Sequence, residues 1–415
     1  MENTTKILAG ATCALAVTAV GSLWFYGIYA AGKSFDETAI GHFRNVLPAE
    51  LSARVTKYEG GFFKKNFDVS FEAVGGVPLG AFHGVAYPGI NTKVVLTRAP
   101  DINFEQSLLR GGVQNFDDVI ELSYSAWDAL RARSLPLPSA HLTYKIKPFT
   151  IVADGQCSFE EFRFDIETGR TVKISASTPG LSCRPIGQPE LKLGRFDFSF
   201  VSQAEPIAKA LNGEDGGLAE TSLKLSMGPM FGGAFRHDGV ELDMKLFAEP
   251  KSETWTETVD FKFKNPTSPA LFLELGQLGE IDYIDGTMRI AGITPQLSDL
   301  FSQGLLAADE SQADWLTLAV IHAIESQGLS IALDPLAVSV RGNEAVVSGT
   351  IAGEKMAGAN QIVGRFAFEA SDGIVLPDIL ADALAQGFLK RDKDKIRSEI
   401  VLTPQYGTAN GLQLY

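Results

Sequence analysis

Apolar and polar residues alternate with a period of two along most of this chain. The pattern is clearest between Ser158 and Phe263, where successive segments carry an apolar residue at every second position. These residues include Phe196, Phe198 and Phe200, then Leu223, Leu225 and Met227, then Val240, Leu242, Met244 and Leu246, and finally Val259, Phe261 and Phe263. Strict alternation indicates strands with one buried face, and turn residues such as Asp238-Gly239 separate the segments as in an antiparallel sheet.

The same period predicts strands nearer the N-terminus. They are expected at Leu51–Lys57, Gly80–Tyr87, Asn91–Leu96 and Leu142–Phe149. The segment Phe116–Arg131 fits two structures, because Val119, Leu122 and Ala126 have helical spacing whereas Leu122, Tyr124 and Ala126 alternate. We favour a helix there over a pair of strands.

The last third of the chain mixes helical spacing with alternation. Helices are predicted at Ser268–Gly276, Pro295–Leu306, Glu310–Gln327 and Pro377–Leu389, and strands at Ser330–Val340, Glu344–Ile351 and Ile362–Glu369. Thr294 is expected to cap the second helix, and Gly328 to end the third. His322 lies on the apolar face of that third helix and is expected to pack in the core. The basic residues after Leu389 suit the C-terminal dipole of the last helix.

The predicted fold is therefore α+β. A single N-terminal transmembrane helix is expected to precede a mostly antiparallel β-sheet body with several packing helices. We expect a short cytoplasmic N-terminus at residues 1–6, a transmembrane anchor at 7–31, a β-rich domain at 32–265, an α+β domain at 266–398 and a loosely ordered tail at 399–415.

The anchor is predicted from the apolar run Ile7–Ala31, since no charge falls between Lys6 and Lys33. A helix of this length rises about 37 Å, which crosses a hydrocarbon core of about 30 Å with some tilt. The alternative is a cleavable secretory signal. That alternative fits less well, because its apolar core is usually about 7–15 residues long and the bulky Ile28 makes a poor cleavage site.

The positive charges flanking the anchor are nearly balanced, so orientation depends on the length of the body that follows. A short N-terminus and a long C-terminal domain favour a cytoplasmic N-terminus, because long domains are translocated largely regardless of charge. In a Gram-negative bacterium this makes the protein a single-pass protein of the inner membrane, with its C-terminal body in the periplasm.

The net charge limits the classes of partner, and the cysteines raise the possibility of a disulfide bond. The formal net charge of −14 argues against nucleic acid as a partner, because phosphate binding needs a concentrated basic surface. Cys157 and Cys183 are the two cysteines of the body, and an oxidising compartment would permit a disulfide between them. Two buried thiols are the alternative, since free cysteine packs as a small hydrophobic residue.

No catalytic, cofactor or metal motif is found in the sequence. The five histidines lack the spacing of a zinc site, and there is no Cys-x-x-Cys or Gly-x-Ser-x-Gly segment. His237-Asp238 is a polar pair, but Asp238-Gly239 already has a role as a turn. The glycine-rich segment Met227–Ala234 lacks the lysine of a phosphate loop. We expect neither a cofactor nor a metal, and we favour a protein without enzymatic activity.

One short stretch resembles a known family. Tyr58, Gly61, Phe62 and Phe63, which follow the anchor and one strand, are similar to the Tyr-x-x-Gly-aromatic-Phe signature of YdgA-like proteins. These are N-terminally anchored, strand-rich bacterial envelope proteins of unknown function. The resemblance covers about the first ninety residues and loosely Leu278–Gly292. The chain departs from the signature at Lys64-Lys65, where a serine is usual, and the resemblance implies no catalytic residue.

These observations predict a membrane-anchored, non-enzymatic periplasmic protein that binds an apolar, lipid-like ligand or an envelope partner protein. The surplus of phenylalanine on alternating strands has two explanations, a groove for lipid tails or an ordinary core that buries every phenylalanine. The alternative is an envelope hydrolase with catalytic residues dispersed in the sequence.

Overall fold

The computed structural model describes most of the chain from Leu51 onward. The described residues are 51–61, 63–73, 77–89, 91–100, 102–125, 139–153, 155–187, 189–211, 218–232, 236–249, 253–267, 281–298, 318–356, 359–373 and 378–414. The chain divides into two compact units, Met1–Ile174 and Ser175–Tyr415. We refer to them as unit 1 and unit 2.

Unit 1 is built on one antiparallel sheet whose strands follow each other in chain order. They are β1 (Leu51–Gly60), β2 (Lys65–Ala73), β3 (Val77–Tyr87), β4 (Asn91–Arg98), β6 (Asp118–Ser125), β7 (Ala140–Ile146) and β10 (Phe162–Thr168). A smaller group of paired strands contains β5 (Val113–Gln114), β8 (Phe149–Ala153) and β9 (Gly155–Phe159). The helix α3 (Ile102–Arg110) links β4 to β5.

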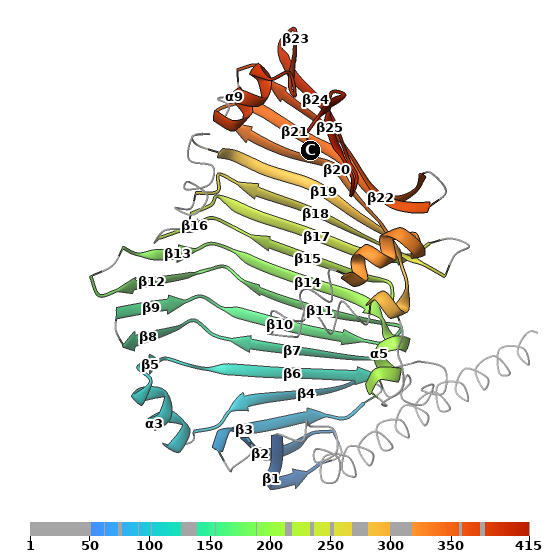
Figure 1. Ribbon diagram of the computed structural model, residues 1–415. Helices are drawn as coiled ribbons and strands as arrows, with labels where there is room; N and C mark the ends of the chain where they lie inside the picture. The colour runs from blue at the N-terminus through green and yellow to red at the C-terminus, as the bar shows by residue number, and fades with distance from the viewer. Residues whose placement is uncertain are drawn as a thin grey trace, which may run out of the picture. The chain divides into compact units, whose positions relative to one another are not determined.

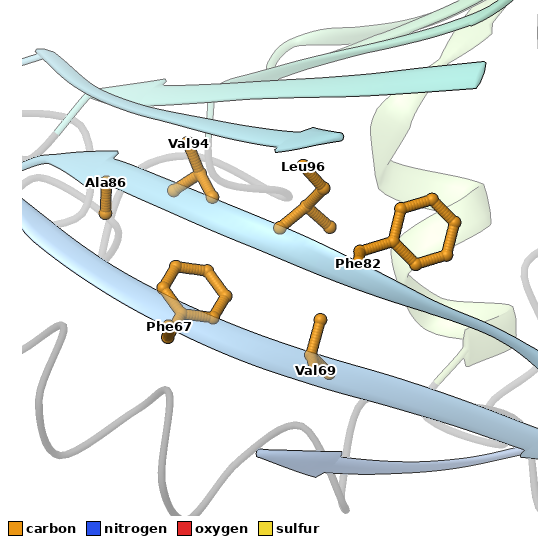
Figure 2. Packing of buried hydrophobic residues seen from close by; sticks show 6 residues of the cluster. All are labelled: Phe67, Val69, Phe82, Ala86, Val94 and Leu96. Atoms are coloured by element: carbon orange, nitrogen blue, oxygen red, sulfur yellow. The ribbon is translucent and has the colours of Figure 1, made fainter. Parts of the chain in front are cut away.

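The core of unit 1 lies on one face of β2, β3 and β4. Its six buried apolar residues are Phe67, Val69, Phe82, Ala86, Val94 and Leu96, and Figure 2 shows their side chains gathered over these strands. Phe67 is only 1% exposed. Its ring lies directly over Gly84, the residue opposite it on β3, so that a Cβ atom at Gly84 would overlap the ring.

Unit 2 contains a longer antiparallel sheet, which Figure 1 shows as a ladder of neighbouring strands. The order is β14 (Phe196–Gln203), β15 (Thr221–Met227), β17 (Gly239–Ala248), β18 (Trp255–Lys264), β19 (Ile281–Ile293), β20 (Ser330–Val340), β21 (Asn343–Met356), β22 (Ala359–Ser371) and β24 (Lys395–Leu402). Beyond β24 follow β25 (Gly407–Ala409) and β26 (Leu412–Gln413), while β23 (Lys390–Asp392) forms a hairpin with β24.

Shorter elements accompany this sheet. β12 (Leu181–Pro185), β13 (Leu191–Leu193) and β16 (Met230–Phe231) pair with one another, and β11 (Thr171–Thr178) carries the chain from unit 1 into unit 2. The described helical elements include α5 (Ala204–Leu211), the π-helical turn η1 (Ala323–Gln327) and α9 (Asp378–Ala385).

Two small hydrophobic clusters occupy opposite ends of the unit 2 strands. One contains Ile293, Leu297, Ala323, Ile324 and Leu329, which pack against the strand residues Leu246, Trp255, Ile290 and Ile351. The other joins α9 to Ala370, Leu389 and Ile396. The helical segments therefore cover the margins of the sheet.

The predicted β-rich α+β body is confirmed, because the described chain is mostly antiparallel sheet with few helices, whereas the predicted transmembrane helix lies outside the described residues. The predicted strand Ser330–Val340 coincides with β20, and the turn after it has Arg341 and Gly342 at φ values of 51° and 75°. The Thr294 cap is also present, since its hydroxyl accepts a hydrogen bond from the Leu297 N–H at 3.3 Å. Gly328 has a φ of 79° at the end of η1, as expected of a helix-ending glycine.

Four local predictions are wrong. Asp118–Ser125 is the strand β6 rather than a helix, because pairing with β4 and β7 on both sides satisfies its backbone. His322 is exposed, because Ala323 and Ile324 of η1 are the residues that face the core. The chain beyond Glu399 is ordered in β24, β25 and β26, where Ala409 is buried. The basic residues after Leu389 lie on the β23–β24 hairpin and not at a helix end.

The predicted domain boundary after residue 265 also differs from the structure. β18 and β19 pair along their length across that position, so both belong to unit 2. The predicted helix at Ser268–Gly276 lies outside the described residues.

Candidate ligand-binding face

The apolar side chains of unit 2 form four rows that cross eight strands, from β14 to β22. The strand register defines the two middle rows as Phe198–Leu225–Leu242–Phe261–Gly286–Leu336–Val347–Phe368 and Phe200–Leu223–Met244–Val259–Met288–Leu333–Gly349–Phe366. The outer rows are Phe196–Met227–Val240–Phe263–Ile284–Val338–Ala345–Ala370 and Ser202–Thr221–Leu246–Glu257–Ile290–Ile331–Ile351–Gly364. Alternate residues of a strand share a face, so all four rows lie on the same side of the sheet. We call this side the apolar face.

The middle rows are not sealed from solvent. Every residue from Phe198 to Phe368 in one row, and from Phe200 to Phe366 in the other, is only partly buried. Eight strands at about 4.8 Å spacing span about 35 Å, so the middle rows form a long apolar strip. A sheet that packs against a second layer along its whole length would bury such residues fully.

The margins of the apolar face are better covered. Leu246 and Ile290 of one outer row pack beneath Val320, Ala323 and Ile324. At the other margin, Ala345 and Ala370 pack against α9 and Leu389. The strip between the two clusters is thus bordered by helical segments and partly exposed along its centre.

Glu257 is the one charged residue in the four rows. It lies on β18 opposite Leu246 of β17 and Ile290 of β19. Among the residues that the structure describes, none forms a hydrogen bond or an ion pair with its carboxyl group. Burial in these apolar surroundings raises the pKa of Glu257.

The opposite face of the same strands is polar and carries a trough of about 920 Å³. Its walls are two polar rows, Asp197–Ser226–Glu241–Lys262–Asp285 and Ser199–Lys224–Asp243–Asp260–Thr287. Because side chains alternate across a sheet, the floor between these rows is the backbone of the middle row that contains Phe198 and Gly286.

The charged groups of the trough are largely engaged with one another. Lys262 Nζ lies 3.1 Å from Asp285 Oδ2, Lys224 Nζ lies 3.1 Å from Asp243 Oδ2, and Thr287 donates a 2.6 Å hydrogen bond to Asp260. Asp243 and Asp260 face each other across β17 and β18. Asp243 Oδ1 is buried and has no hydrogen-bond partner among the described residues.

A polar cluster in unit 1 was missed by sequence reasoning. His141, Thr143 and Arg163 surround the Asp165 carboxylate, with Thr143 Oγ1 2.5 Å and His141 Nε2 3.2 Å from Asp165 Oδ1. Partial burial raises the pKa of Asp165, but the hydrogen bonds from Arg163, Thr143 and His141 outweigh it and lower that pKa to about 2. These residues are far apart in the sequence, and only the pairing of β7 with β10 brings them together.

The family-like residues lie on the β1–β2 hairpin. Tyr58 packs against the unit 1 core, and the Gly61 N–H donates a 3.0 Å hydrogen bond to the Lys64 carbonyl. Phe63 is 56% exposed, and Phe62 lies outside the described residues. Their positions indicate a turn-forming role for Gly61, at which a Cβ atom would approach the Lys64 carbonyl to 2.7 Å.

Cys157 lies on β9 and Cys183 on β12, and each is disulfide-bonded. The anchor from Ile7 to Ala31 lies outside the described residues, and no helix within the described ranges is long and apolar enough to span a membrane. His237 is fully buried, which lowers its pKa despite the nearby Asp238.

No group of acidic, histidine or cysteine side chains within the described part of the chain is arranged to hold a metal ion. Comparison of the chain with known protein families, curated proteins and solved structures finds no match. The relation to YdgA-like proteins therefore stays a prediction from the sequence.

Proposed function

We propose that this protein is a membrane-anchored, non-enzymatic periplasmic protein that binds the acyl chains of an amphiphilic lipid on the apolar face of unit 2. The supporting observation is the pair of middle rows, which remain partly exposed across eight strands. Transfer of apolar surface from water stabilises binding by about 0.8 kcal/mol for each CH₂ group buried. A long apolar strip therefore suits a long flexible chain.

The shape of the strip favours lipid over a folded partner protein. Its helical borders, formed by residues 318–327 and α9, lie at opposite ends of the strands, and the middle rows between them stay partly exposed. A protein interface more commonly combines an apolar centre with polar groups at its rim. The rows instead contain one charged residue, Glu257, and it lies at the covered margin.

The alternative of a hydrolase would place chemistry in the polar trough, where Asp243 and Asp260 face each other. A general acid–base pair needs one carboxyl group free to exchange its proton with a substrate. Here Asp243 is held by Lys224 and Lys245, and Asp260 accepts a hydrogen bond from Thr287. These contacts support a structural role for both carboxylates.

Site-specific photocrosslinking tests the proposal in the full chain. A benzoylphenylalanine residue replaces Phe261 on the apolar face in cells grown with radiolabelled acetate, which marks acyl chains. Lys262, the next residue on the same strand, points to the opposite face and provides the matched control position. After irradiation, we expect the purified chain to retain label at position 261 and not at position 262.

Two results would contradict lipid binding. One is absence of label at position 261 and at a second apolar position, Leu242. The other is a discrete crosslinked protein of higher mass at both positions, which would identify the apolar face as a protein interface. Equal labelling at positions 261 and 262 would show that the reaction reports proximity to membrane alone, and it would also count against the proposal.

A further inference from the structure

Glu257 is placed where a bound amphiphile would change from tail to head. Its strand neighbours on the same face are Trp255, which packs in the covered cluster, and Val259, which belongs to a middle row. The carboxyl group therefore lies between the helix-covered margin and the open strip. A ligand whose chain occupies the strip can bring its head group to this boundary.

Among the described residues, none supplies a counter-charge to the Glu257 carboxyl group. Its cross-strand neighbours are Leu246 and Ile290, and no other position of the four rows carries a charge. The nearby Arg289 belongs to the opposite face, where its guanidinium lies 3.9 Å from Glu249. A partly desolvated carboxylate in apolar surroundings is costly unless a partner compensates for the lost water.

We propose that Glu257 binds the head group of the amphiphile, and that this head group carries a protonated amine. This inference rests on the proposed function of the apolar face. An ammonium group donates up to three hydrogen bonds and provides the missing positive charge, so it compensates a lone carboxylate more completely than a hydroxyl does. The four rows contain no lysine, arginine or histidine to hold a phosphate or carboxylate head.

The net charge of the protein agrees with this choice. At −14 the chain disfavours anionic ligands and attracts cationic ones. The carboxyl group gives selectivity for the head, whereas the middle rows hold the chain. Removing the carboxyl charge should therefore weaken amine binding and leave binding of the same tail with a neutral head unchanged.

The experiment compares two probes with the same C18 tail, a diazirine-tagged amine and the corresponding alcohol. The full chain, in one fixed concentration of maltoside detergent, is titrated with each probe and irradiated, and labelled peptides are quantified. The variants are Glu257→Gln and, as a matched control, Glu241→Gln on the neighbouring strand, whose carboxylate belongs to the opposite face.

We expect the wild-type chain to bind the amine about tenfold more tightly than the alcohol, since a hydrogen bond between two charged groups is stronger than one to a neutral hydroxyl. Glu257→Gln should abolish this preference and keep the alcohol affinity, which also verifies that the variant is folded. Glu241→Gln should behave as the wild type does.

The outcomes separate the two proposals. If both probes label β17 and β18 of the wild type equally and Glu257→Gln changes neither, lipid binding stands and the amine assignment is wrong. If Glu241→Gln reduces the amine preference as much as Glu257→Gln does, the effect is one of net charge and the assignment is also wrong. If neither probe labels these strands in the wild type, the proposed function itself fails.

Discussion

Asp118 holds the guanidinium of Arg98 through two parallel hydrogen bonds, from Nε at 2.5 Å and from Nη2 at 2.6 Å. Asp118 is fully buried, and Tyr144 donates a third hydrogen bond to it at 2.9 Å. The Arg98 side chain also lies over the rings of Phe82 and Phe116. Burial raises the pKa of Tyr144, and the Asp118 charge raises it further.

We predict that Asp118→Ala lowers the free energy of unfolding by about 3–5 kcal/mol, because it leaves a partly buried guanidinium without its counter-ion. Urea titration of the full chain, followed by circular dichroism, measures the loss. The double variant Arg98→Met with Asp118→Leu should recover most of it, because no charge is then left buried. A double variant as unstable as Asp118→Ala would show that packing around the pair matters more than charge.

Gly84 gives a second prediction, because its lack of a side chain makes room for the Phe67 ring. Gly84→Ala should cost about 1–3 kcal/mol, since the ring is buried and the core around it is closely packed. Gly89→Ala is the matched control, because the nearest atom to its Cβ position is the Asn91 carbonyl oxygen at 3.6 Å. Its effect should stay within about 0.5 kcal/mol. Equal losses in the two variants would contradict this account of the core.

The raised pKa of Glu257 predicts that the stability of the fold depends on pH. Because burial raises its pKa in the fold, the folded chain holds the proton more tightly than the unfolded chain. The resulting stabilisation is complete below the unfolded pKa and is lost as pH rises through the folded pKa. Its four neighbours on the apolar face, Trp255, Leu246, Ile290 and Val259, carry no ionisable group that offsets this effect.

Glu257→Gln should therefore raise the thermal midpoint at pH 7.5, because glutamine has no carboxyl charge that folding must desolvate or neutralise. The difference should shrink as pH falls and vanish below 4.5, the ordinary pKa of glutamate. Thermal scans of both chains without added ligand, over a series of buffers, measure it. A variant less stable than the wild type at pH 7.5 would show that Glu257 has a stabilising partner in the fold.

The two body cysteines predict a single intramolecular bridge. A tryptic digest without reductant should yield one linked species containing Cys157 and Cys183, which reduction separates. Replacing both by serine should lower the free energy of unfolding by about 2–4 kcal/mol. Free thiols at both positions in protein isolated without reductant would contradict the prediction.

Much of this protein follows from local pattern. The period-two alternation from Phe196 to Phe263 specifies strands and assigns Phe198 and Phe261 to one face, because side chains alternate in every extended strand. Gly328 and Thr294 likewise have local roles, which depend on backbone conformation and on a hydrogen bond within three residues. These features need no information about distant parts of the chain.

Features that depend on which residues of distant strands pair with each other are determined only by the tertiary structure. The sequence around Leu122 fits both strand alternation and helical spacing. The pairing of β6 with β4 on one side and β7 on the other makes this segment a strand. His322 is exposed because the η1 turn buries Ala323 and Ile324 instead. Above all, only cross-strand pairing places Glu257 between Leu246 and Ile290. A residue's own strand fixes its face, but its neighbours on that face come from segments distant in sequence, and their alignment sets its electrostatic environment.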